Sequence, residues 1–251
     1  MRISVEPFVP AQADEQDLRG YYDVTTAVFL EAGPDTPQPA FETVADVLRT
    51  PDGPSARRMF WVARYGDRNI VGLVIAHLPL AENTEAVIAS VRVLSASRRQ
   101  GIGSALLRTM LNDTALATGR SRLVGSDVAG GSDGDRWAAG LGFKRTQERV
   151  LQVLPVTEVD SARWDVPSPR GFALKAWSGA APESLVADYA RARSAMTDAP
   201  VGNSSLRTPE WTVERVRERE AFEREAGREQ WVVAICCESY PCSALSGPAM
   251  P

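Results

Sequence analysis

A chain of 251 residues, 44% of them hydrophobic, is long enough to fold into one large domain or two modest ones. Its 28 basic and 32 acidic residues give a net charge of −4, and the arginines are scattered among acids, which argues against a nucleic-acid partner. No apolar run approaches the roughly 20 residues of a membrane span, and the acid-rich N-terminal segment is unlike a secretory signal. We therefore expect a globular cytoplasmic protein without a membrane partner.

The N-terminal third is predicted to alternate between strands and helices. Apolar residues recur at i, i+3, i+4 and i+7 from Phe41, the spacing of an amphipathic helix, and Pro51 ends that run. Two strand-like segments flank Gly66-Asp67, which predicts a hairpin with this pair as its turn. The predicted elements are a strand over Ile3 to Phe8, a helix over Leu18 to Leu30, a loop over Glu31 to Pro39, a helix over Phe41 to Leu48, and strands over Met59 to Arg64 and Ile70 to Leu78.

A strand, a loop and a helix come next. The alternation from Val87 to Leu94 indicates a strand with two different faces, and helical spacing continues from Gly101 to Thr118. The loop between them reads Arg98-Arg99-Gln100-Gly101-Ile102-Gly103. Its glycines let backbone approach a ligand closely, and the first amides of the helix lack partners within it. Together with the two arginines, this helix N-terminus predicts a phosphate-binding loop.

Two common phosphate motifs do not fit this loop. No Lys-Ser/Thr pair follows Gly103, as a P-loop requires, and the glycine spacing is too short for a dinucleotide fingerprint. The loop instead resembles the signature of the GNAT superfamily of acyl-CoA-dependent N-acyltransferases, Arg/Gln-x-x-Gly-x-Gly/Ala, through Arg98, Gly101 and Gly103. Gly142-Phe143 matches a second family element, and the resemblance covers roughly Ile3 to Leu154. It implies an α/β GNAT fold, with a mixed, mostly antiparallel sheet and flanking helices.

The resemblance also implies acetyl-CoA as co-substrate and no metal. In this family, loop amides hold the CoA pyrophosphate, and the preceding strand pairs through its backbone with the pantetheine arm. The implied cofactor-binding residues are Val91, Val93, Leu94, Arg98, Arg99, Gln100, Gly101, Ile102, Gly103 and Ser104.

The general acid is left open by the sequence. A strand over Arg122 to Val128, a flexible segment over Gly130 to Gly134 and a short helix over Asp135 to Gly140 lead to the Gly-Phe element. Family members commonly place a tyrosine five residues before that phenylalanine, to protonate the CoA thiolate. Ala138 stands there in this chain, so Ser132, a water molecule or unassisted departure remain as alternatives.

An amine that arrives as ammonium must lose a proton before it attacks, so a nearby carboxylate or a water chain is expected. The candidates are Glu31, Glu85 and Asp127. Asp127 is favoured because Gly125, close before it, admits a ligand and because the fourth and fifth strands diverge at the family's active site. His77, the only histidine, is interpreted as a surface or core residue.

The C-terminal part resembles an incomplete second copy, as in the tandem GNAT proteins of GC-rich bacteria. Its order is strand, helix, helix, strand, with Thr208-Pro209-Glu210 as a helix start. The cysteines at 236, 237 and 242 lack a zinc-site spacing, and their segment is interpreted as a disordered tail or the product of a shifted or truncated frame. The predicted elements are a strand over Phe172 to Trp177, helices over Glu183 to Met196 and Pro209 to Ala226, and a strand over Gln230 to Ile235. The predicted domains are a catalytic domain over 1–155, closed by a strand over Val150 to Leu154, a linker over 156–169, a non-catalytic partial domain over 170–235 and an irregular tail over 236–251.

The resemblance implies a bacterial N-acetyltransferase that moves an acetyl group from acetyl-CoA to a primary amine of a small molecule, peptide or protein. The amine attacks directly in a ternary complex, with Asp127, Ser132 and Glu31 as candidate catalytic residues. The alternative is a non-catalytic CoA-binding regulatory or interaction module, which Ala138 and the incomplete second half favour. The apolar side chains of the second half also predict packing against the first domain or a homodimer.

Overall fold

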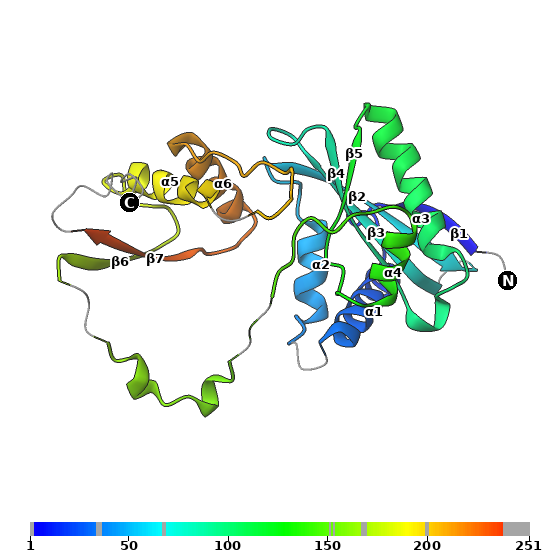
Figure 1. Ribbon diagram of the computed structural model, residues 1–251, viewed down its shortest axis with the longest axis horizontal. Helices are drawn as coiled ribbons and strands as arrows, with labels where there is room; N and C mark the ends of the chain where they lie inside the picture. Colours follow the sequence, from blue (N-terminus) through cyan, green and yellow to red (C-terminus); the bar gives the residue numbers. More distant parts are fainter. Residues whose placement is uncertain are drawn as a thin grey trace. The chain divides into compact units, whose positions relative to one another are not determined.

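The chain divides into two compact units, residues Met1–Lys144 and Arg145–Pro251, in a computed structural model (Figure 1). The structure describes residues 3–33, 37–66, 69–150, 152, 154–166, 170–198 and 201–237.

Unit 1 is built on a five-stranded sheet in the order β1-β2-β3-β4-β5. The first four strands are antiparallel neighbours, whereas β5 runs parallel to β4. The strands are β1 (Ile3–Phe8), β2 (Ala56–Tyr65), β3 (Asn69–Pro79), β4 (Ala86–Val93) and β5 (Arg122–Gly125).

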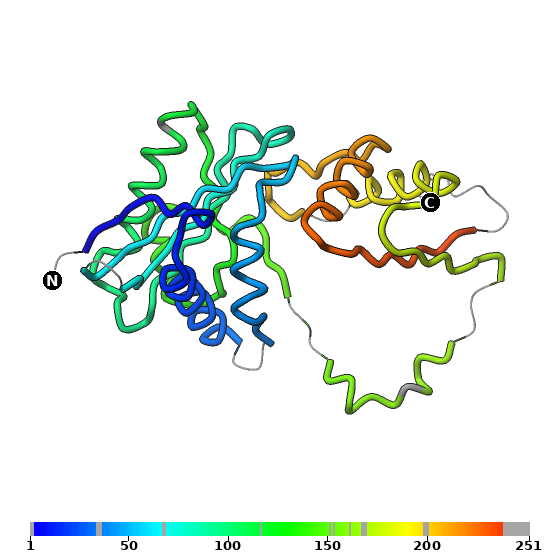
Figure 2. Tube along the Cα trace, turned by 180° about the vertical axis from the view of Figure 1, so that it is seen from behind, coloured from blue at the N-terminus to red at the C-terminus, as the bar shows by residue number. Residues whose placement is uncertain are grey.

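Helices cover both faces of this sheet, as the ribbon and the reverse view show (Figures 1 and 2). Phe60 and Val62 of β2 pack with the helices on one face, whereas Trp61 and Ala63 pack with those on the other. Both faces are therefore buried, which explains why this strand is a continuous apolar run rather than an alternating one. The helices are α1 (Glu15–Ala32) and α2 (Phe41–Arg49) on the first face, α3 (Ile102–Leu111) on the second, and α4 (Asp133–Gly140) near the start of α3.

Ion pairs attach α1 to the edge of the sheet. The Arg64 side chain, on β2, is 6% exposed and bonds through Nε to Glu6 on β1 at 2.7 Å. Its two Nη atoms bond to Asp17 in the first turn of α1 at 2.7 and 3.0 Å. The Asp14 side chain caps the same turn by accepting from the Asp17 N–H at 2.8 Å. These contacts set where α1 begins and how it lies on the sheet.

Unit 2 repeats the first half of unit 1 in element order. Two antiparallel strands, β6 and β7, flank two helices, as β1 and β2 flank α1 and α2. A small core of Ala181, Val186, Ala190 and Val216 joins the helices to Trp177 on β6. The elements are β6 (Phe172–Ser178), α5 (Val186–Ser194), α6 (Val213–Glu225) and β7 (Trp231–Cys237), together with short 3-10 turns at Val156–Glu158, Ser161–Trp164 and Ala195–Asp198.

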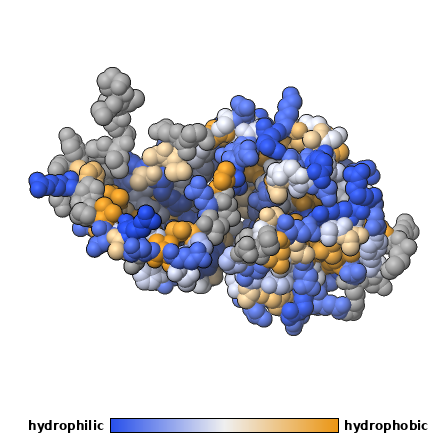
Figure 3. Space-filling view, turned by 60° about the horizontal axis from the view of Figure 1, so that its bottom comes forward, coloured by the Kyte–Doolittle hydropathy of each residue, from blue (hydrophilic) through white to orange (hydrophobic). Residues whose placement is uncertain are grey.

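The other side of the β6–β7 pair is exposed. Leu174 faces Ile235 across the pair, and these side chains are 61% and 62% exposed. Figure 3 shows several hydrophobic patches on a face of the molecule that is otherwise mostly hydrophilic. No helix in the described ranges is both long enough and apolar enough to cross a membrane.

Most predicted elements of unit 1 are confirmed within a few residues, and two corrections concern strands. The fifth strand ends at Gly125 rather than at Val128, and the chain then turns through Asp127 at φ 58°. The strand predicted over Val150 to Leu154 is wrong where the chain is described, because Val150, Gln152 and Leu154 are irregular and largely exposed. Leu151 and Val153 lie outside the described residues.

The second half brings two further corrections. The helix predicted from Pro209 begins at Val213, because the Thr212 side chain, and not that of Thr208, accepts from the N–H three residues later at 3.3 Å. Strand β7 continues through Cys236 and Cys237, two residues into the predicted tail. The prediction for the remaining tail, with Cys242, lies outside the described residues, as do Asp67 of the predicted turn and Pro167 and Pro169 of the predicted linker.

Candidate active site

The outer edge of β4 has no described partner strand in its second half. The Leu94 N–H donates to the Val71 carbonyl on β3 at 3.0 Å, and peptide groups along a strand alternate in direction. Val91 and Val93 therefore present their peptide groups to the opposite side, toward β5. The described pairing with β5 ends at Ala89 and Gly125, and the Ser126 N–H donates to the Ala89 carbonyl at 2.9 Å. The edge at Val91 and Val93 is thus available to an extended, hydrogen-bonding ligand.

The turn from β4 into α3 exposes a set of amides. Arg99 and Gly101 both have left-handed backbone, at φ 62° and 80°, and Gly101 is the N-cap residue of α3. No side chain caps this helix, so the first-turn amides of Ile102, Gly103 and Ser104 have no acceptor within it. A Cβ placed on Gly101 would meet nothing within 4 Å, so the space before these amides is open. Successive amides around left-handed residues form an anion-binding concavity.

Two side chains hold this turn in place. The Trp137 indole N–H, on α4, donates to the Ser104 hydroxyl at 3.2 Å, and its ring lies 3.6 Å from where a Cβ of Gly103 would stand. The Tyr65 hydroxyl, at the end of β2, donates to the Gln100 side chain. The turn is therefore fixed from both α4 and the β2 end.

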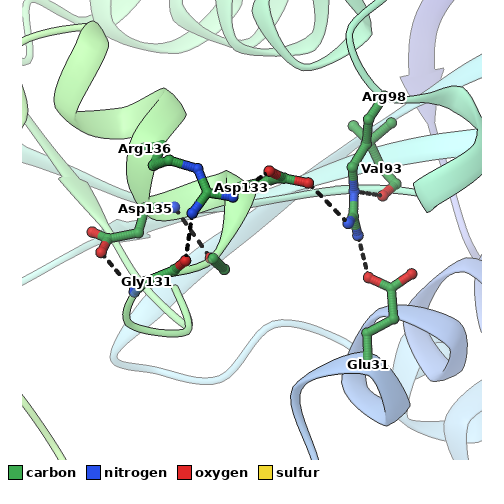
Figure 4. A network of polar contacts seen from close by, with 8 residues as sticks. Glu31, Val93, Arg98, Gly131, Asp133, Asp135 and Arg136 are labelled. Carbon is green, nitrogen blue, oxygen red and sulfur yellow. Dashed lines mark hydrogen bonds and ion pairs between the residues drawn. The ribbon is translucent and has the colours of Figure 1, made fainter.

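The Arg98 guanidinium is directed at protein groups (Figure 4). Its Nε donates to the Val93 carbonyl at 3.1 Å, and one Nη bonds to the Glu31 carboxylate at the end of α1. The other Nη lies 3.7 Å from a carboxylate oxygen of Asp133 at the start of α4. Arg98 thus connects β4, α1 and α4, and brings Glu31 to the turn between β4 and α3.

Ser132 is the N-cap residue of α4. Its hydroxyl accepts from the Asp135 N–H at 3.2 Å, and the Asp135 carboxylate accepts from the Gly131 N–H at 2.9 Å (Figure 4). Arg136 donates to Asp133 at 2.6 Å, and this hydrogen bond, followed by the charge of Arg136, lowers the pKa of the Asp133 carboxyl. Ser132 therefore stabilises the start of α4 while its own hydroxyl proton is not used in that bond.

Asp127 lies just beyond β5, opposite the last residues of β4. An Asp127 carboxylate oxygen is 3.9 Å from an Arg92 Nη atom, and the Arg92 guanidinium carbon lies 4.8 Å from the centre of the Phe29 ring on α1. The Arg92 side chain is 13% exposed, whereas that of Asp127 is 45% exposed. Sequence reasoning missed Arg92 and Trp137, because their partners lie on other elements and no local spacing marks them.

Glu85, the remaining candidate for the base, and the histidine His77 lie away from this end of β4. Glu85 precedes β4, at the end opposite to Val93, and pairs with Arg122 at 2.9 Å. His77 is part-buried on β3 opposite Ile88, and burial, followed by the charge of Arg58, lowers the pKa of its imidazole. The structure therefore brings Glu31, Asp127 and Ser132 to the carboxyl end of β4 but places Glu85 away from it. In the described ranges, no group of three or more His, Cys, Asp or Glu residues could hold a metal ion.

In the described residues, the open edge of β4 and the uncapped start of α3 form one continuous polar surface. A family model described as "Acetyltransferase (GNAT) family" matches residues 21–129, which contain β4, the turn and α3. The chain thus contains a GNAT-family acetyltransferase domain.

Comparison with solved structures shows a tandem GNAT fold with a partial second copy. A tandem GNAT protein from the clavulanic acid biosynthesis pathway is 21% identical and gives a TM-score of 0.64, with 95% of this chain and 71% of that chain covered. A ribosomal-protein-alanine N-acetyltransferase from Brucella melitensis biovar Abortus 2308 is 18% identical, covering 61% of this chain and 100% of that chain at a TM-score of 0.43. An N-acetyltransferase from Staphylococcus aureus Mu50 is 15% identical, covering 59% and 86% at 0.46. No curated protein matches the chain.

Proposed function

We propose that this protein is an N-acetyltransferase that transfers the acetyl group of acetyl-CoA to a primary amine within a ternary complex. The main support for this proposal is that the open edge of β4 and the start of α3 form one continuous binding surface. The free edge of β4 at Val91 and Val93 leads directly to the uncapped amides of α3. Acetyl-CoA has the matching layout, since an amide-containing arm connects its thioester to a pyrophosphate.

The pyrophosphate would bind at the start of α3. The amides of Ile102, Gly103 and Ser104 donate to it, and the helix dipole favours its negative charge. Arg99, exposed in the turn, supplies a cation beside these amides. Arg98 and Gln100 act by holding the turn, since their side chains are bonded to Glu31 and Tyr65.

The pantetheine arm would lie along β4 as an additional strand. Its amides would pair with the outward peptide group of Val91 and with the Val93 N–H, because the Val93 carbonyl already accepts from Arg98. The Leu94 N–H is already bonded to β3, so Leu94 contributes only through its side chain. A backbone N–H of β4 then polarises the thioester carbonyl, as a donor aimed at developing negative charge.

In the transfer step, the amine nitrogen attacks the thioester carbon, the C–S bond breaks, and the amide and the CoA thiol are the products. The amine must first lose a proton, and we assign this role to Asp127, through direct contact or a water molecule. Ser132 donates a proton to the departing thiolate, since the hydroxyl proton is not used in capping α4. Glu31 is the second base candidate, and it would act only after release from Arg98.

Unit 2 is assigned a structural role. Its described elements correspond to β1, α1, α2 and β2 and contain no counterpart of the β4 edge or of the turn into α3. We also propose a catalytic domain over 1–155 and a non-catalytic partial domain over 170–235. We further propose that the protein is cytoplasmic and forms a homodimer through its second half.

The test measures CoA binding and turnover separately in the full-length protein. Calorimetry with CoA tests the cofactor path, and release of free thiol from acetyl-CoA across a panel of primary amines tests catalysis. Amine-dependent thiol release supports the enzyme. CoA binding without release of thiol with any amine would favour the non-catalytic CoA-binding module that Ala138 suggests. Absence of CoA binding would overturn both.

A further inference from the structure

The Arg92 side chain lies on the face of β4 that α1 covers. It is 13% exposed, and its two described contacts are the Phe29 ring, 4.8 Å from its guanidinium carbon, and the Asp127 carboxylate, 3.9 Å away. Neither contact is a short hydrogen bond. Arg64, a buried arginine near the end of β2, instead makes three bonds of 2.7 to 3.0 Å. A guanidinium has five N–H donors, and a buried charge without close partners is unfavourable.

A second polar atom on this side of the sheet lacks a partner. The Thr25 hydroxyl oxygen is buried and has no hydrogen bond to any group that the structure describes. Thr25 lies one helical turn before Phe29 on α1, on the same side of the helix. A ligand oxygen beside α1 would give this hydroxyl an acceptor.

Arg92 also lies next to the proposed reaction centre. It lies between Val91 and Val93, whose peptide groups line the edge assigned to the pantetheine arm. Its side chain and Asp127 place one positive and one negative group at 3.9 Å from each other. A ligand with an ammonium and a carboxylate a few bonds apart has the complementary arrangement.

We propose that the acceptor is a zwitterionic amino acid, with its carboxylate bound by Arg92 and its ammonium nitrogen directed to Asp127. This inference rests on the proposed function, because it names the substrate class of the same site. Arginine binds a carboxylate through two parallel N–H donors. A phosphate-bearing amine fits less well, because its second negative charge would face Asp127 with no further cation among the contacts described for this pair.

The experiment compares L-amino acids with their amides, which retain the amine but lack the carboxylate. The full-length protein, loaded with CoA, is titrated with each compound by calorimetry, and thiol release from acetyl-CoA is measured with the same pairs. We expect at least one amino acid to bind and react about 10- to 100-fold better than its amide, the range for one charged hydrogen-bonded pair. In Arg92→Gln this preference should disappear, and in Arg92→Lys part of it should remain.

Arg122→Gln is the matched control. It removes an arginine at the other end of the β4–β5 pair, where the guanidinium is bonded to Glu85, so the preference for the carboxylate should persist. CoA affinity and the melting temperature are measured in every variant to separate loss of specificity from loss of fold.

The outcomes separate this inference from the proposed function. Amino-acid binding that requires Arg92, with no thiol release, would support the contact between Arg92 and the carboxylate but would overturn catalysis, and with it the assignment of the amino acid as acceptor. Equal use of acids and amides, or no binding of any amino acid to the CoA-loaded protein, would overturn the inference while acetylation of other amines still supports the enzyme. If Arg92→Gln weakens binding of the amide as much as binding of the amino acid, each relative to the wild type, the inference is also overturned, because Arg92 would then act on structure alone.

Discussion

The two glycines of the phosphate-binding turn should respond to the same substitution in opposite ways. Gly101 has φ 80°, and an alanine there would adopt left-handed backbone, at a cost of about 1–2 kcal/mol. Gly103 is helical, and its Cβ would meet Trp137 at 3.6 Å and Val93 at 3.8 Å, which are ordinary contacts. Alanine at this position is favoured over glycine by up to about 1 kcal/mol in a helix.

Gly101→Ala is therefore expected to lower the melting temperature and Gly103→Ala to leave it unchanged or raise it. Gly101→Ala should also weaken CoA binding by about tenfold, or roughly 1.4 kcal/mol, because the change in backbone reorients the first amides of α3. Gly103→Ala should keep CoA binding within about twofold, since the new methyl group rests on Trp137 rather than before the amides.

The assay is thermal unfolding followed by circular dichroism, with CoA affinity measured by calorimetry on the same preparations. Gly103→Leu is the steric control, because its larger side chain cannot fit between Trp137 and Val93 and should destabilise the protein. A Gly101→Ala variant that is as stable as the wild type and binds CoA equally well would contradict the role assigned to the left-handed backbone at Gly101. The same role is contradicted if Gly103→Ala is the more damaging of the two.

Four further changes test the contacts around the site. Arg98→Ala should weaken CoA binding by about 1–3 kcal/mol through loss of the bond to the β4 carbonyl and of the link to α1, measured by calorimetry. Arg64→Ala should lower the free energy of unfolding by about 1–3 kcal/mol in denaturant, a limited cost because both of its carboxylate partners reach solvent. CoA affinity should not change. Ser132→Ala should destabilise α4 by about 1 kcal/mol, seen as a lower melting temperature, and a fall in the rate of thiol release at saturating substrate would support its role as acid. Because the pKa of Asp133 is lowered, its carboxylate adds stability above its unfolded pKa, and this stability is lost as the pH falls through the lower folded value. Arg136→Gln should reduce that acid dependence in melts between about pH 2 and 5.

Those parts of the fold that depend on spacing along the chain could be predicted from the amino-acid order alone. The alternation before Leu94 and the helical repeat after Gly101 identified β4, the turn and α3, because side-chain direction follows backbone period in both elements. The need for a left-handed residue explains a glycine at the start of α3. The repeated strand-helix-helix-strand order identified unit 2 for the same reason.

Which groups the site brings together depends on packing between elements that are distant in the chain. Arg98 is bonded to Glu31, which is 67 positions away in the chain, and no local pattern encodes a pair at that separation. The same holds for Arg92, whose contacts come from α1 and from the residue after β5. Local signals also failed where tertiary packing outweighed them. The cap of α6 formed at Thr212 although Thr208 precedes a proline, because capping depends on where the helix packs as well as on residue type.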